Sequence, residues 1–320
     1  MTQYNWSNLT NNQSIAFNPV SDRLTFDDVS ITPPSIWLSW IGSASVTLSV
    51  NGKAVVLQTD VKALTTANVT FASNGLLVVG DNTVATTLDD SGNTLTGSAQ
   101  DDRLYGLGGS DLINAGDGND YIAVTYSSNS VGNDTVNGGN GFDILSFSTN
   151  SSATPLTVNL ATHTATSLQG TLTLSGIETI FGTSQNDLFI GGDPAHAMDA
   201  LGNLSSERFR GLAGSDTIIG GGTGFGATAD YTNNASNQVV IADLRSGLVI
   251  DGLGGVDTLV NVRAIWAGAA NDQLTGGSLG RTSSGMYLEI FRGNAGNDVI
   301  NGNNAYSDGG PASEDRADYS

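Results

Sequence analysis

From residue 89 onward, one short pattern recurs: an aspartate followed two residues later by a large apolar residue. Its clearest copy is GLGGSDLINAGDGNDYIAV at 106–124, where Ile113 and Ile122 stand nine residues apart, each two positions after an aspartate. A flexible glycine linker would not hold apolar residues at a fixed period, so the spacing predicts a repeated structural unit. Ten aspartates fit the pattern: Asp102, Asp111, Asp120, Asp134, Asp143, Asp187, Asp216, Asp257, Asp272 and Asp298.

The nine-residue unit predicts a turn followed by a short strand. Seven of the ten aspartates have glycine two positions earlier. Glycine suits turns that require a positive φ, and the next three residues, with an apolar residue in the middle, suit a strand. If two units complete one coil, each unit stacks on the next unit but one along the chain. Asp102 and Asp120 should then lie along one edge of a roll and Asp111 along the other.

A longer repeat contains the short one. The three aspartates without the turn glycine recur at one fixed interval: Asp102, Asp187 and Asp272. Residues 171–182 and 256–267 correspond at the same interval. We therefore expect three repeat blocks, at 89–181, 182–266 and 267–320. The third block is incomplete, so we expect the chain to be the N-terminal part of something longer.

Residues 1–88 predict a separate β-rich, sandwich-like module. Strand-like segments flank Asn51-Gly52 and Asn74-Gly75, and Asn-Gly is a strong signal for a two-residue hairpin turn. Three of the four tryptophans lie here and suggest a small conventional core: Trp6, Trp37 and Trp40.

Charge and composition exclude several classes. The net charge of −20 argues against nucleic acid as a partner, because phosphate binding needs clustered lysine and arginine, and it favours cations. The chain has no cysteine, which excludes disulfides and thiolate metal sites. No apolar stretch is long enough for a transmembrane segment, and the N-terminus lacks the features of a cleaved signal peptide.

Stacked aspartates predict calcium. Carboxylates about 5 Å apart repel, and glycine loses much backbone entropy on folding, so the roll should be poorly stable alone. Ca²⁺ accepts about six to eight oxygen ligands, from carboxylates and backbone carbonyls alike. We expect several ions, with the ten aspartates as principal ligands and Asp102, Asp187 and Asp272 as weaker ligands or end-of-roll positions. The turn glycines expected at the same sites are Gly109, Gly118, Gly141, Gly214, Gly255 and Gly296.

Residues 89–320 resemble the RTX (repeats-in-toxin) family of haemolysin-type calcium-binding repeats. The motifs that carry the resemblance are GLGGSDLIN at 106–114, GLGGVDTLV at 252–260 and NGGNGFDIL at 137–145. The resemblance implies an all-β fold of right-handed parallel β-rolls. It also implies type I secretion without a cleaved N-terminal signal, and folding outside the cell when calcium is met.

Two functions remain open. The first is a secreted structural or adhesion-type protein, with a cell-surface or matrix partner that the sequence does not identify. The alternative is the secretion and folding region of a larger RTX protease, lipase or other hydrolase whose catalytic domain lies beyond Ser320. Nothing in these residues predicts catalysis: GGSLG around Ser278 has no strand-to-helix context, and His163 and His196 belong to no H-E-x-x-H motif.

Overall fold

The computed structural model describes residues 1–40, 44–124, 132–148, 154–167, 170–192, 207–221, 227–277, 289–302 and 316–318. These residues form an all-β structure. Its described helices are three short 3-10 turns, η1 (Trp6–Asn8), η2 (Pro33–Ser35) and η3 (Val61–Ala63). None of the described helices has the length and apolar character needed to cross a membrane.

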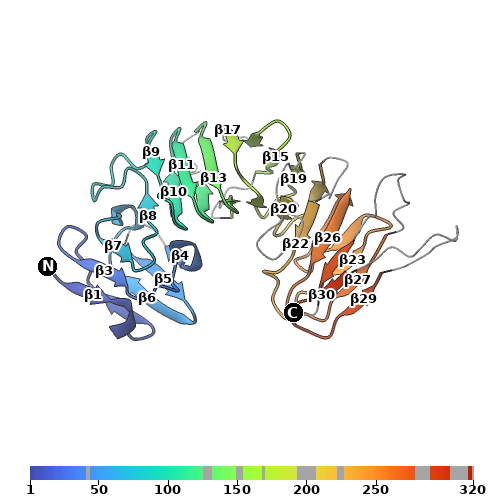
Figure 1. Cartoon of the computed structure of the whole chain (residues 1–320), viewed down its shortest axis with the longest axis horizontal. Helices are drawn as coiled ribbons and strands as arrows, with labels where there is room; N and C mark the ends of the chain where they lie inside the picture. The colour runs from blue at the N-terminus through green and yellow to red at the C-terminus, as the bar shows by residue number, and fades with distance from the viewer. Residues whose placement is uncertain are drawn as a thin grey trace. The chain divides into compact units, whose positions relative to one another are not determined.

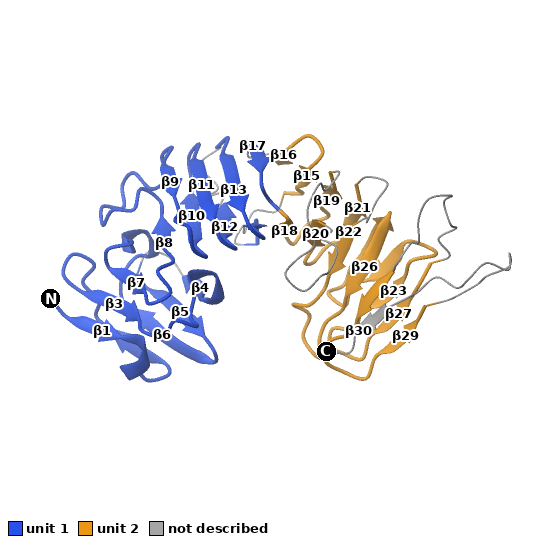
Figure 2. Ribbon diagram, viewed as in Figure 1, with its two compact units in different colours: residues 1–152, 169–177 blue, residues 153–168, 178–320 orange. Residues whose placement is uncertain are grey.

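The chain divides into two compact units, shown in Figure 2. Unit 1 comprises Met1–Ser152 and Gln169–Ile177, and unit 2 comprises Ala153–Leu168 and Glu178–Ser320. Unit 1 holds the N-terminal sheets and the first stack of repeats, and unit 2 holds the later repeats.

Two small sheets form the N-terminal part of unit 1. The parallel sheet contains β1 (Gln3–Asn5), β3 (Arg23–Phe26) and β7 (Val69–Phe71). The mixed sheet runs β2 (Gln13–Ile15), β6 (Lys53–Leu57), β5 (Val46–Val50) and β4 (Trp37–Trp40). Their core contains a stack of three aromatic rings, with Phe26 between Trp6 at 4.6 Å and Phe71 at 4.8 Å.

One of the two predicted Asn-Gly hairpins is present. Strands β5 and β6 pair antiparallel around Asn51 and Gly52, whose φ values of +53° and +74° suit a type I′ turn. The second hairpin is wrong: β7 pairs with β3, whereas the strand after Asn74-Gly75, β8 (Leu77–Val79), pairs in parallel with a strand of the repeats, β10 (Arg103–Leu107). Asn74-Gly75 predicts a local turn, but the pairing of each flanking strand depends on a partner that is distant in sequence.

The tryptophan prediction is only partly right. Trp6 is 5% exposed and belongs to the core. Trp37 is 59% exposed, and Trp40 is half-buried with its ring edge-on to Tyr105 at 5.7 Å. In β4 the buried position belongs to Leu38, because side chains alternate between the faces of a strand.

The first stack of repeats consists of two parallel sheets whose strands alternate along the chain (Figure 1). One sheet contains β8, β10 (Arg103–Leu107), β12 (Tyr121–Val124) and β14 (Ile144–Ser146). The other contains β9 (Thr94–Thr96), β11 (Leu112–Asp117), β13 (Thr135–Asn140) and β17 (Gly170–Ser175).

The register confirms that two nine-residue units make one coil. Leu104 pairs with Ile122, and Leu95 with Ile113, so each strand pairs with the strand two units further along the chain. Each of these apolar side chains is at most 1% exposed. One central residue per strand therefore fills the space between the sheets, which is why the sequence repeats a single large apolar residue per unit.

Unit 2 repeats this arrangement. One of its sheets contains the parallel strands β18 (Thr179–Phe181), β20 (Glu207–Arg210), β22 (Ala227–Asp230), β26 (Val262–Trp266), β28 (Ile290–Arg292) and β30 (Arg316–Asp318). The other contains β15 (Thr157–Asn159), β16 (Thr164–Ser167), β19 (Leu188–Ile190), β21 (Thr217–Ile219), β23 (Ile241–Asp243), β24 (Leu248–Ile250), β25 (Val256–Val260), β27 (Gln273–Thr275) and β29 (Val299–Asn301). Phe189 of β19 stacks on Phe209 of β20 at 5.4 Å, so the core again lies between the two sheets.

Two antiparallel hairpins lie in the second sheet of unit 2, where β24 also pairs antiparallel with β25. They are β15–β16 and β23–β24, and their first strands begin at Thr157 and Ile241, close to one long repeat apart. The sequence repeat predicts the recurrence of these segments but not their direction. In each hairpin a short loop turns the chain back, so the second strand pairs antiparallel with the first.

Candidate calcium sites

The ten predicted aspartates form ladders along the edges of the roll. In each step the backbone N–H of one aspartate donates to Oδ1 of the aspartate in the next coil, at 2.7–2.9 Å. The ladders run Asp102–Asp120–Asp143, Asp111–Asp134, Asp187–Asp216–Asp257 and Asp272–Asp298. As predicted, Asp102 and Asp120 lie on one edge and Asp111 on the other, because the strands after them belong to different sheets.

The three aspartates that open a block have a distinct set of partners. Their Oδ1 atoms accept a backbone N–H from a segment outside the nine-residue repeats, at 2.6–2.8 Å, from Leu76, Leu156 and Val240 respectively. Their Oδ2 atoms accept the N–H of the residue four positions earlier, from Ser98, Thr183 and Gly268 respectively. Both oxygens of each block-opening aspartate therefore have backbone donors.

Two aspartates in later coils retain an unsatisfied oxygen. Asp120 and Asp216 are each 1% exposed, yet no described donor reaches their Oδ2 atoms. A buried carboxylate oxygen without a partner is costly unless a cation or a proton neutralises it. The ladder thus separates aspartates that backbone donors satisfy from aspartates that need an additional partner.

Burial raises the pKa values of ladder aspartates in both groups, including the block-opening Asp102, Asp187 and Asp272. Burial first, and then the charges of stacked neighbours, raise the pKa of Asp111 and Asp120 to about 7 and that of Asp216 to about 8. At Asp257 burial raises the pKa to about 6, although hydrogen bonds from Asp216 and Tyr231 oppose the rise. Without a cation, these carboxyl groups are therefore held partly protonated near neutral pH.

The six predicted turn glycines lie where the coils stack. Five of them have φ between +104° and +136°, a region that L side chains rarely adopt, and Gly255 is the exception. A Cβ at three of them would overlap backbone atoms of the neighbouring coil. In each case the overlapped residue is the one that replaces the turn glycine in a block-opening unit: Gln100 for Gly118, Gln185 for Gly214 and Ala270 for Gly296.

Gly255 and Gly254, adjacent in one turn, offer a matched test of this stacking. A Cβ on Gly255 would overlap the carbonyl oxygen of Gly214, whereas a Cβ on Gly254 would meet nothing within 4 Å. We expect Gly255→Ala to destabilise the roll by about 4 kcal/mol or more, because backbone must move. Gly254→Ala, which strains only its φ of +108°, should cost about 1–3 kcal/mol. Thermal unfolding in calcium, followed by circular dichroism, measures both; equal losses would contradict this account.

Glutamates occupy the aspartate position in the first sheet of unit 2, which the sequence analysis missed. Glu178, Glu207 and Glu289 each stand two residues before a buried apolar residue, and all three are buried. Glu207 accepts the N–H of Gly192 at 2.8 Å, and Glu289 accepts that of Gly277 at 3.0 Å. The sequence does carry a signal for Glu207 and Glu289. Each glutamate stands two residues before a phenylalanine, and each follows a Gly-Gly pair at a longer interval than the aspartates follow their turn glycines.

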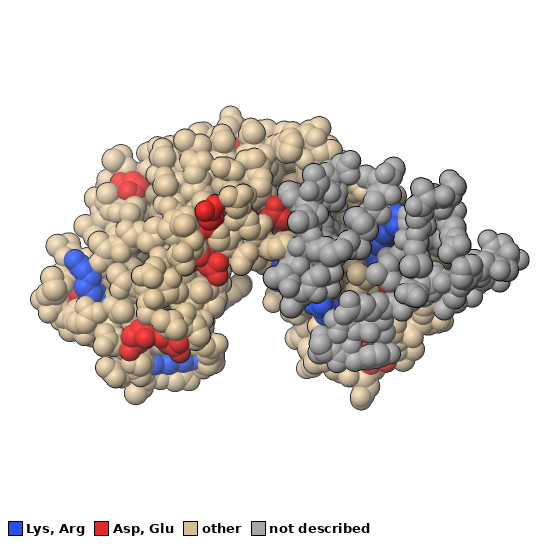
Figure 3. Space-filling model, in the orientation of Figure 1, with Lys and Arg blue, Asp and Glu red and all other residues tan. Residues whose placement is uncertain are grey.

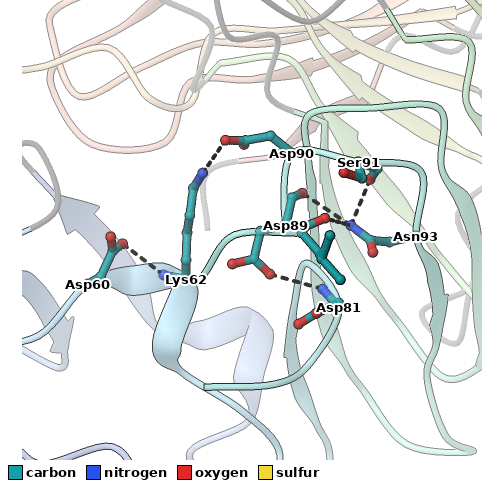
Figure 4. Close-up of polar contacts among 8 residues, drawn as sticks. Asp60, Lys62, Asp81, Asp89, Asp90, Ser91 and Asn93 are labelled. Carbon is teal, nitrogen blue, oxygen red and sulfur yellow. Dashed lines mark hydrogen bonds and ion pairs between the residues drawn. The ribbon is translucent and has the colours of Figure 1, made fainter. Parts of the chain in front are cut away.

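Two buried aspartates outside the predicted set also keep an unsatisfied Oδ2: Asp89 and Asp251. Figure 4 shows the Asp89 carboxylate directed at the backbone N–H of Asp81, which donates to Oδ1 at 3.1 Å, while Lys62 pairs with Asp90. Burial is the main cause that raises the pKa of Asp89 to about 6. Asp89 has no apolar residue two positions later, and Leu253, which follows Asp251 at that interval, lies in a turn and not a strand.

The residues present fit calcium by the chemistry of their donors. In the described residues no three His, Cys, Asp or Glu side chains form a metal-holding group by themselves, so backbone carbonyls would have to complete any site. Calcium accepts such mixed oxygen sets. On the face drawn in Figure 3, acidic side chains of described residues reach the surface only in separate patches, since most ladder aspartates are buried.

Of the residues considered for catalysis, His163 is exposed in the β15–β16 turn. Ser278 and His196 lie outside the described residues.

Comparison with known families gives a match to the RTX calcium-binding nonapeptide repeat. The matched residues are 89–122, 130–146, 173–193, 201–223, 264–278 and 287–305. No curated protein matches the chain. The match agrees with the parallel sheets and with the aspartates that follow the turns. Between residues 89 and 305 this chain carries the haemolysin-type calcium-binding repeats of the RTX family.

Proposed function

We propose that the repeats of this chain bind several calcium ions and that this binding drives folding of the roll. The observation that supports the proposal most directly is the unsatisfied, buried Oδ2 of stacked aspartates, at Asp120 and Asp216. Each ion that binds only the folded form stabilises it by roughly 2.7 kcal/mol at a hundred times its dissociation constant. Several sites would offset the repulsion within the ladders.

Within this proposal the aspartates divide into two groups. Those with an unsatisfied Oδ2 would hold calcium together with turn carbonyls. The block-opening Asp102, Asp187 and Asp272 would instead mainly accept backbone N–H groups, which supports the weaker binding expected for them from the missing turn glycine.

We further propose that the protein acts outside the cell as a structural or adhesion-type component. RTX proteins are generally secreted, and calcium-dependent folding suits a chain that meets abundant calcium only after export. No catalytic activity is proposed for these residues. A catalytic domain elsewhere in a longer chain would make the same roll its secretion and folding region.

Substitution of Asp120 and Asp102 by asparagine tests the assignment. Asparagine keeps the oxygen that accepts the ladder N–H and removes the carboxylate charge. We expect Asp120→Asn to weaken calcium binding at its site about tenfold or more, and Asp102→Asn to lower thermal stability with little change in calcium affinity. Isothermal titration calorimetry of both variants with calcium measures the difference, and the reverse order of affinities would refute the assignment.

A further inference from the structure

An acidic cluster in unit 2 includes an aspartate that is not in the repeat's aspartate position. Asp251 lies six residues before Asp257, at the start of the same turn. Asp216, Asp251 and Asp257 are each at most 1% exposed, and the Tyr231 hydroxyl donates to Oδ2 of Asp257 at 2.8 Å. Three carboxyl groups and a tyrosine are thus buried together.

The oxygen atoms of this cluster are unequally satisfied. Oδ1 of Asp251 accepts three backbone N–H groups of its own turn, at 2.8–3.0 Å, from Leu253, Gly254 and Gly255. Oδ1 of Asp216 accepts the N–H of Asp187 at 2.8 Å. No described donor reaches Oδ2 of Asp251 or Oδ2 of Asp216, and both atoms are buried.

The two unsatisfied carboxylates lie within electrostatic reach of each other. After burial and the charges of Asp257 and Asp187, the charge of Asp251 is a further cause of the raised pKa of Asp216. Burial is the main cause that raises the pKa of Asp257 and of Tyr231, and the charge of Asp251 adds to the rise in both.

A backbone oxygen lies beside the same carboxylate. A Cβ on Gly255 would meet both the carbonyl oxygen of Gly214 and Oδ2 of Asp251, the latter at 2.9 Å. The absence of a side chain at Gly255 thus leaves room for a carbonyl and a carboxylate oxygen to approach one point. Side chains alone do not complete a metal site in the described residues, so such carbonyls are needed.

We propose that Asp251 is an additional calcium ligand, acting with Oδ2 of Asp216 and the carbonyl of Gly214, and that it makes this the tightest site of the described roll. The inference rests on the proposed function, calcium binding by the repeats. Calcium affinity rises with the number of charged ligands and the rigidity of the site. Asp251 adds a negative charge that an ordinary nine-residue unit lacks, and three backbone hydrogen bonds hold it in place.

Calorimetric titration of the full chain with calcium tests the proposal. Asp251→Asn keeps the Oδ1 acceptor and should remove one ion from the tightest class, or weaken that class at least tenfold. Asp243→Asn is the matched control: it removes the same charge from unit 2, but Asp243 pairs with Arg245 at the surface and should leave the tight class unchanged. Unchanged tight binding in Asp251→Asn would overturn the proposal and indicate that the two carboxylates share a proton instead. Absence of calcium binding in the unsubstituted protein would instead overturn the proposed function.

Terbium luminescence supplies a second readout that does not depend on the folding of Asp251→Asn. The Tyr231 hydroxyl is hydrogen-bonded to Asp257 beside the site. Energy transfer from Tyr231 should therefore give strong emission from the first equivalent of Tb³⁺ when tyrosine is excited. Tyr231→Phe should reduce that first-equivalent emission several-fold while retaining the ion. If Tyr231→Phe leaves the emission from the first equivalent unchanged, the tightest ion binds elsewhere, and the proposal is refuted.

Discussion

Removal of calcium should abolish the β-sheet signal of the repeats and leave the N-terminal sheets folded. Each ladder places buried carboxylates in successive coils, and at Asp120 and Asp216 one oxygen has no described donor. Without cations these groups must either remain charged in an apolar environment or take up protons, and both outcomes oppose folding near neutral pH. The two N-terminal sheets pack around an aromatic core at Phe26, and their described strands hold no buried carboxylate oxygen without a donor.

Far-UV circular dichroism with and without chelator measures this effect, and hydrogen exchange locates it. Slow exchange should persist at the buried strands β5 and β6 and disappear at β10 to β14. Excess calcium should restore the signal, whereas magnesium should not, because it demands a smaller, near-octahedral site. Identical melting of the repeats in chelator and in calcium would show that the metal does not stabilise the roll.

In the calcium-free protein, lowering the pH from about 8 to about 5.5 should restore structure to the roll. The folded-state pKa of Asp216 is raised to about 8 and those of Asp111 and Asp120 to about 7, from an ordinary value of 3.8. The folded state therefore binds more protons than the unfolded state between these ordinary and raised pKa values. Stability then rises as the pH falls through the folded-state pKa values, and is lost as the pH rises through them.

Metal-free protein prepared by dialysis and followed by circular dichroism across this range tests the sign. The acid end of the range remains above the pH at which carboxyl groups with lowered pKa, such as Asp22 and Asp28, would lose their stabilising charge. Saturating calcium should remove or reverse the trend, since cations and protons compete for the same oxygens. A metal-free roll that loses structure on mild acidification would contradict the raised pKa values.

Much of the repeat architecture follows from local pattern. The nine-residue spacing predicts which apolar residues pair, and Leu104 with Ile122 confirms it. The same spacing predicts the two edges of aspartates. The pairing of non-repeat strands is less accessible, because β8 and β23 pair with strands that are distant in sequence and that no local signal specifies. Trp37 shows the same limit, since residue type alone does not tell which face of β4 is buried.

By itself, the sequence determined that the chain forms coils of two units, with glycine turns, one apolar residue per strand and aspartates at the edges. These properties are periodic, and periodicity is local. Only the tertiary structure decided which carboxylate oxygens stay unsatisfied, because their donors come from residues that are distant in sequence. The backbone N–H of Asp216, for example, donates to Asp257, 41 residues away, while Oδ2 of Asp216 faces no described donor. Calcium chemistry depends on that balance of donors and acceptors, which arises when the coils stack.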